Sequence, residues 1–95
     1  MRKYEVMFIL KSNLEEEKRN AVIEKFKGII EADGEIEKVD LWGNRKLAYE
    51  INKINDGYYV VINFKASIDV PKELDRNFRI SDDVMRHLIV NLEEK

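Results

Sequence analysis

The most constraining feature of the sequence is the stretch at residues 43–64. Apolar and more polar residues alternate with a period of two over residues 46–51, which places the two sets on opposite faces of a strand. Residues 55–57, Asn-Asp-Gly, carry turn chemistry, and aromatic and β-branched residues follow. The stretch therefore predicts a long hairpin with a tight turn at 55–57. Arg45 and Lys46 add positive charge near the start of its first strand.

Two helices and two further strands are predicted around this hairpin. Strands are expected at residues 4–10 and 84–92, and residues 35–52 are extended with a bulge or bend near 39–43. A capping box of Ser12 and Glu15 opens the first helix, and Gly34 follows it in the left-handed conformation. Asp69 caps the second helix, with Pro71 in its first turn.

The resulting order is β-α-β-β-α-β, which is the ferredoxin-like α+β pattern. We expect a single domain spanning residues 1–95, because the chain has the length of one domain. Its four-stranded antiparallel sheet would carry both helices on one face. The first and third strands would be central, and the second and fourth would form the edges.

Composition excludes several classes of function. The chain has no cysteine, which excludes disulfides, thiolate metal sites and cysteine nucleophiles. Its one histidine, His87, excludes two-histidine metal sites, and no phosphate-binding glycine motif occurs. No segment has the length of a membrane span or the features of a signal peptide. We therefore expect no enzyme, no cofactor, no metal site, no small-molecule substrate and no membrane contact, and a cytoplasmic location fits.

The sheet face opposite the helices is predicted to be apolar. Alternation places one set of residues under the helices: Val6, Phe8, Val60, Ile62 and Phe64. The opposite face would carry Met7, Ile9, Tyr59, Val61, Leu88 and Val90. An exposed apolar patch of this kind indicates a protein partner. Two alternatives remain open, namely a register error of one residue in one strand and self-association.

Basic residues are predicted at two ends of this fold. Arg2, Lys3, Arg45 and Lys46 are expected at the end where the first strand begins, and Arg79 and Arg86 at the opposite end. The net charge is -2, so RNA binding would depend on such local patches. Ordinary solvated Lys and Arg residues would look the same.

The third strand does not match the aromatic motif of RNA-recognition domains. Residues 56–63, Asp-Gly-Tyr-Tyr-Val-Val-Ile-Asn, lack the basic start and the later aromatic residues that this octamer requires. Tyr59 is the one remaining stacking candidate. An independent RNA-recognition-type module that binds single-stranded RNA is therefore the alternative function. A small ferredoxin-like enzyme or effector module would need a glycine-containing phosphate loop after the first strand, and residues 11–13 lack one.

The chain resembles the bacterial small-subunit ribosomal protein six family over essentially its whole length. The resemblance rests on three stretches: Met-Arg-Lys-Tyr-Glu at the start, the Gly-x-Arg-Lys-Leu-Ala-Tyr-x-Ile run at 43–51, and Phe-Arg-Ile-Ser-Asp-Asp-Val at 78–84. Glu50 stands where members often carry proline after Leu-Ala-Tyr, a change that keeps a backbone donor.

The resemblance implies a non-enzymatic ribosomal protein in the cytoplasm. It would be a structural constituent of the small ribosomal subunit that binds the central domain of small-subunit (16S) rRNA together with ribosomal protein eighteen. The apolar outer face would contact that protein. The basic residues that match the family's motifs are candidates for RNA contact, and Lys3 joins them on charge alone: Arg2, Lys3, Arg45, Lys46, Arg79 and Arg86.

Overall fold

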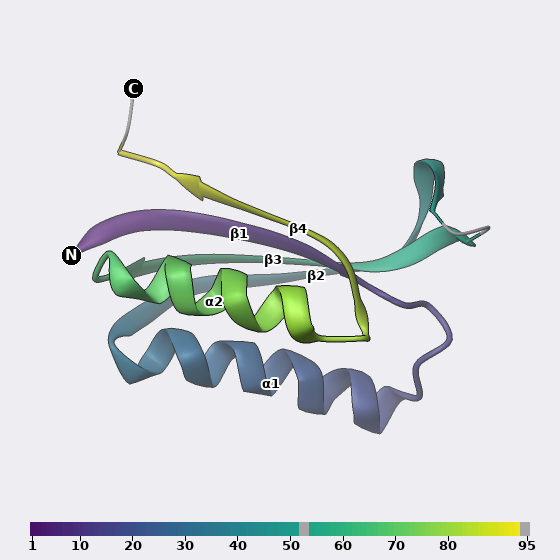
Figure 1. Cartoon of the computed structure of the whole chain (residues 1–95), viewed down its shortest axis with the longest axis horizontal. Coiled ribbons are helices and arrows are strands. Elements are labelled where there is room, and N and C mark those ends of the chain that lie inside the picture. Colours follow the sequence, from purple (N-terminus) through teal and green to yellow (C-terminus); the bar gives the residue numbers. More distant parts are fainter. Residues whose placement is uncertain (52–53, 94–95) are drawn as a thin grey trace.

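The computed structural model describes residues 1–51 and 54–93, without the side chains of residues 48–51 and 54. The elements are β1 (Arg2–Leu10), α1 (Glu16–Ala32), β2 (Gly34–Ile51), β3 (Ile54–Ala66), α2 (Asp69–Ile80) and β4 (Val84–Asn91). The strands form one antiparallel sheet in the order β2-β3-β1-β4, and both helices lie on one face of it (Figure 1). The predicted ferredoxin-like fold is confirmed, including which strands are central.

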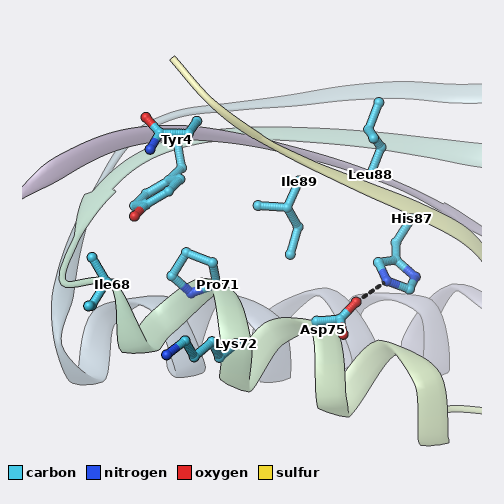
Figure 2. A pocket seen from close by; sticks show the side chains of 9 residues that line it. Tyr4, Ile68, Pro71, Lys72, Asp75, His87, Leu88 and Ile89 are labelled. Atoms are coloured by element: carbon cyan, nitrogen blue, oxygen red, sulfur yellow. Dashed lines mark hydrogen bonds and ion pairs between the residues drawn. The ribbon is translucent and has the colours of Figure 1, made fainter. Parts of the chain in front are cut away.

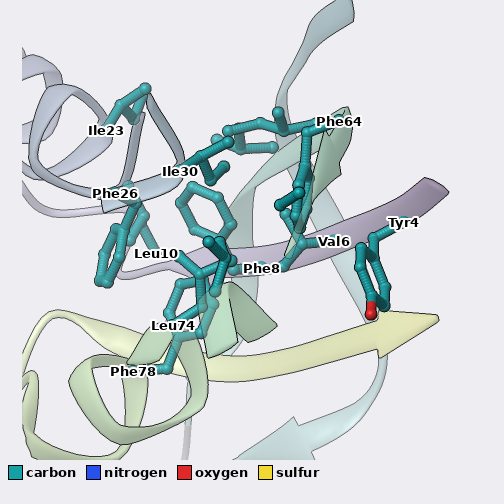
Figure 3. Packing of buried hydrophobic residues seen from close by; sticks show 14 residues of the cluster. Tyr4, Val6, Phe8, Leu10, Ile23, Phe26, Ile30, Phe64, Leu74 and Phe78 are labelled. Carbon is teal, nitrogen blue, oxygen red and sulfur yellow. The ribbon is translucent and has the colours of Figure 1, made fainter. Parts of the chain in front are cut away.

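The core fills the space between the sheet and the two helices. Phe8 of β1 meets Phe26 of α1 and Phe78 of α2, with ring centroids 4.3 to 5.3 Å apart (Figure 3). All five residues predicted to face the helices are fully buried. Burying a large apolar side chain is worth about 2 to 3 kcal/mol, so this layer supplies much of the stability. Alternation along the first strand of the hairpin also predicts Tyr49 to pack in the core, but its side chain lies outside the described part of the chain.

The predicted turn at residues 55–57 is wrong, because these residues belong to β3. The ladder between β2 and β3 continues through Arg45↔Gly57 and Lys46↔Asp56 to Ile51↔Ile54. Gly57 serves close packing there, since a Cβ atom would collide with Cγ2 of Ile9. The hairpin is therefore longer than predicted, and it projects beyond the end of β1 (Figure 1).

Neither helix start has the predicted side-chain cap. Glu15 is the residue before α1 and makes no capping hydrogen bond, while the Ser12 hydroxyl donates to Asp56 Oδ1 at 3.0 Å. The N-cap residue of α2 is Ile68, so Asp69 is already the first helical residue. The Ser12 hydroxyl is therefore bonded to the β2–β3 hairpin and not to the start of α1.

Gly34 lacks the left-handed conformation predicted for it, whereas Gly43 lies where an irregularity was predicted. Gly34 is the first residue of β2 and does not have a positive φ; a Cβ atom there would lie 2.5 Å from the Lys65 carbonyl oxygen. Gly43 is the glycine with positive φ, at 80°. It lies at the register shift between Leu41 and Gly43, which confirms the irregularity predicted near residues 39–43.

Candidate interaction surfaces

The sheet face opposite the helices carries the six residues predicted for it. Strand register places Leu88, Met7 and Val61 side by side across β4, β1 and β3. In the next row Ile9 pairs with Tyr59 on one side and Arg86 on the other. Alternation therefore assigned the side chains to the correct face of every strand concerned.

Exposure on this outer face is uneven. Leu88 and Val90 of the edge strand are 55% and 38% exposed, whereas Ile9 and Val61 are 4% and 7% exposed. Met7 and Tyr59 are intermediate. Ile9 and Val61 lie on the central strands β1 and β3, each of which has a neighbouring strand on both sides, whereas β4 is an edge strand. The expected exposed patch therefore has two parts. Ile9 and Val61 are buried, and Leu88 and Val90 form an exposed apolar margin on β4.

An aromatic pair that sequence analysis did not anticipate adds to this face. The rings of Trp42 and Tyr59 are nearly parallel, at 9°, with centroids 6.1 Å apart, and Trp42 is 48% exposed. The Arg45 guanidinium lies 6.0 Å from the Trp42 ring, and its Nε donates to the Trp42 carbonyl oxygen. The available signal was the chain's single Trp next to Gly43, because a bulge redirects side chains.

The predicted placement of Arg45 and Lys46 is wrong. Because β2 runs parallel to β1 in space, Gly34 starts it at the same end as Arg2, and its later residues lie at the other end. Arg45 and Lys46 pair with residues beyond the Leu10↔Tyr58 pair, past the end of β1. The two residues are exposed there on the projecting hairpin.

The six basic candidates therefore form two groups. Arg2 and Lys3 are exposed at the start of β1. The other four lie toward the opposite end: Arg45, Lys46, Arg79 and Arg86. Arg79 forms an ion pair with Asp75, with Nε 2.9 Å from Oδ2. The structure does not bring all six together.

A groove of about 600 Å³ lies between α2 and β4 (Figure 2). At one end, His87 Nε2 and Asp75 Oδ1 are 2.7 Å apart, and the His87 ring stacks on Phe78 with centroids 4.8 Å apart. The hydrogen bond with His87, together with the charge of Arg79, lowers the pKa of Asp75. His87 thus links β4 to α2 through Asp75 and Phe78.

The described residues contain neither a cluster of metal-ligating side chains nor a membrane-spanning helix. They contain no group of three or more His, Asp and Glu residues that could hold a metal ion. Within the same part of the chain, no helix is long and apolar enough to cross a membrane.

Comparison with known proteins identifies the family. The family model described as Ribosomal protein S6 matches residues 3–91. The chain belongs to the ribosomal protein S6 family. Proteins named small ribosomal subunit protein bS6 from Alkaliphilus oremlandii and Clostridium acetobutylicum are 68% and 58% identical to it, with 99% of this chain and 100% of each relative covered.

A solved structure agrees with the family assignment. The 30S ribosomal protein S6 of Thermotoga maritima is 40% identical and superposes with a TM-score of 0.89, covering 95% of this chain and 86% of that one. The predicted family is confirmed. Members of the ribosomal protein S6 family are structural ribosomal components rather than enzymes, so the predicted absence of enzymatic activity and the predicted place in the cytoplasmic ribosome are confirmed as well.

Proposed function

We propose that this small-subunit protein binds the central domain of the small-subunit rRNA together with ribosomal protein eighteen. The observation that carries the proposal is the pairing of an uncovered apolar sheet face with basic residues at both ends of the sheet. A face that the protein's own helices leave open is suited to a protein partner. Exposed basic residues beyond that face suit phosphates.

The protein-partner surface consists of the six outer-face residues, with the open margin of β4 as its accessible part. Leu88 and Val90 would enter the interface, while Ile9 and Val61 support it from below. In protein interfaces a few well-packed side chains carry most of the binding energy. Leu88 is the best single anchor because it is large and 55% exposed.

The RNA contacts would come from the two basic groups. Arg45 and Lys46 are the strongest candidates, since both are exposed on a hairpin that projects from the body of the fold. Contacts of this kind position a protein on folded RNA through phosphates and shape rather than through base reading. Arg2, Lys3, Arg79 and Arg86 would add contacts elsewhere on the same RNA.

A gel-shift experiment with a central-domain rRNA fragment tests the proposal. Binding should be weak for this chain alone and tighter when ribosomal protein eighteen is present, because the two surfaces add. Arg45→Gln should weaken binding and lower the slope of log affinity against log salt by about 1. Lys25→Gln, an equal charge change on the exposed surface of α1, is the control. Equal affinity with and without ribosomal protein eighteen would contradict the proposal.

The Trp42–Tyr59 pair favours a second candidate, an independent module that binds single-stranded RNA by stacking. Base stacking on aromatic side chains contributes about 1 to 3 kcal/mol per base. Because the chain has one Trp, quenching of its fluorescence by a short single-stranded RNA reports directly on this site. Tyr59→Ala should then abolish binding. Unchanged fluorescence, or unchanged affinity in the variant, would reject this candidate.

A further inference from the structure

The edge of β4 presents backbone groups that nothing in the described chain pairs. The Leu92 N–H donates to the Lys3 carbonyl oxygen at 2.9 Å, so even-numbered residues of this strand face β1. Alternation then turns the N–H and C=O groups of His87, Ile89 and Asn91 to the open edge. The side chains of the same three residues line the groove beside α2. The unpaired backbone groups and the groove therefore lie next to each other along β4.

This edge lacks the features that usually block strand addition. Proteins protect edges with lysine, proline, bulges or inward charges. The opposite edge, β2, has three register shifts and an ion pair between Lys38 and Asp40. Strand β4 has no proline or lysine, its one irregularity lies near Leu10 and Val84, and residues 88–90 are Leu-Ile-Val. The contrast marks β4 as the edge that is left open.

We infer that β4 is a strand-addition site, taking an extended segment of a neighbouring small-subunit protein. Only a polypeptide backbone supplies alternating donors and acceptors at strand spacing, whereas an RNA backbone would leave the carbonyl groups unpaired. Every second side chain of the added segment would enter the groove, between Pro71 of α2 and Ile89 of β4 (Figure 2). Those side chains would be apolar.

The charges in the groove indicate where the added segment carries an acidic group. Asp75 is already engaged by His87 and Arg79. Lys72 is exposed and has no ion pair among the described residues, and the Tyr4 hydroxyl points into the same end of the groove (Figure 2). A carboxylate at that end would meet one cation and one hydroxyl. A second copy of this chain fits poorly, because β4 itself contains no acidic residue.

This inference depends on membership of the small subunit and not on the RNA contacts or on ribosomal protein eighteen. The test is hydrogen exchange, followed by mass spectrometry, on the full chain free and in reconstituted small subunits. The backbone amides of His87, Ile89 and Asn91 should exchange about tenfold slower or more in the subunit. Unchanged exchange in subunits that contain the chain would overturn the inference. Failure of the chain to enter subunits at all would instead defeat the proposed function, and the inference with it.

Charge variants separate strand addition from general burial. Lys72→Glu should remove most of the added protection, Lys72→Arg should keep it, and Lys25→Glu on α1 is the matched control. Circular dichroism of each free variant checks that it folds. Equal protection from hydrogen exchange in Lys72→Glu and in the Lys25→Glu control would contradict the proposal that the added segment carries an acidic group beside Lys72.

A photoreactive phenylalanine analogue at Ile68, an exposed residue that lines the groove, identifies the occupant. In assembled subunits it should cross-link to a peptide that contains alternating apolar residues and an acidic residue. A cross-link to rRNA, a cross-link to a second copy of the chain, or no cross-link would each overturn the inference.

Discussion

The two faces of the sheet are made by the same strands, yet only one of them is covered. On the inner face, Val6, Phe8 and Ile62 are fully buried under the helices. On the outer face, Leu88 is 55% exposed although its neighbours in the row, Met7 and Val61, are also apolar. An antiparallel sheet with one wet face normally carries polar residues there. Packing against the helices accounts for the inner face, whereas nothing within the described chain covers Leu88 on the outer one.

The outer face also differs within itself. Ile9 is as buried as many core residues, because Tyr59 and Arg86 flank it in the row and its Cγ2 packs against Gly57. Leu88, on the edge strand, has a neighbouring strand on one side only. Position in the sheet, not residue type, therefore decides which outer residues support the fold and which remain available to a partner.

The largest effect should come from the inner face. Phe8→Ala removes the ring that joins both helices to the sheet, and we expect a loss of about 4 kcal/mol in the free energy of unfolding. Urea denaturation followed by circular dichroism measures it. A loss below about 1 kcal/mol would mean that the covered face is not the core.

Ile9→Glu tests the buried part of the outer face. The substitution would place a carboxylate at a site that is only 4% exposed, so we expect the free energy of unfolding to fall by about 3 kcal/mol. Ile9→Val, which keeps the site apolar, should cost about 1 kcal/mol. The same denaturation assay compares the two, and equal small losses would show that this part of the face is open after all.

A smaller, pH-dependent effect should come from the pair that joins α2 to β4. The hydrogen bond with His87, with the nearby charge of Arg79, lowers the folded-state pKa of Asp75. Its carboxylate therefore stabilises the fold above the unfolded-state pKa of about 4, and this contribution is lost as the pH falls through the lower folded value. Melting temperatures measured down to about pH 2 should fall less steeply for Asp75→Asn than for the parent chain. Parallel curves would contradict the assigned role.

The smallest effect on the isolated chain should come from the exposed margin. Leu88→Glu changes a side chain that stands in solvent on an edge strand, so we expect the free energy of unfolding to change by no more than about 0.5 kcal/mol. Chemical denaturation beside the parent chain measures this difference. A large loss would show that Leu88 is part of the core and would remove the contrast between the two outer regions.

The sequence predicted the fold and the facing of its residues because both follow from local periodicity. It did not predict that Ile9 is buried on the outer face, since that burial comes from neighbouring strands. Arg45 and Lys46 were placed at the wrong end even though the predicted antiparallel order already makes β2 run parallel to β1, so the sequence did contain the information needed to place them. Gly57 has turn chemistry, but close packing against Ile9 explains it better. Trp42 was missed because a bulge determines where its side chain points.

The most direct test of the assembly role is uptake into small subunits that lack this chain. Leu88→Glu and Ile80→Glu make the same change at exposed apolar residues, the first on the outer face and the second at the end of α2. In competition with the parent chain, Leu88→Glu should lose about 2 kcal/mol or more of binding free energy, while Ile80→Glu should compete almost equally. Equal uptake of both variants would contradict the claim that the open apolar face exists for assembly.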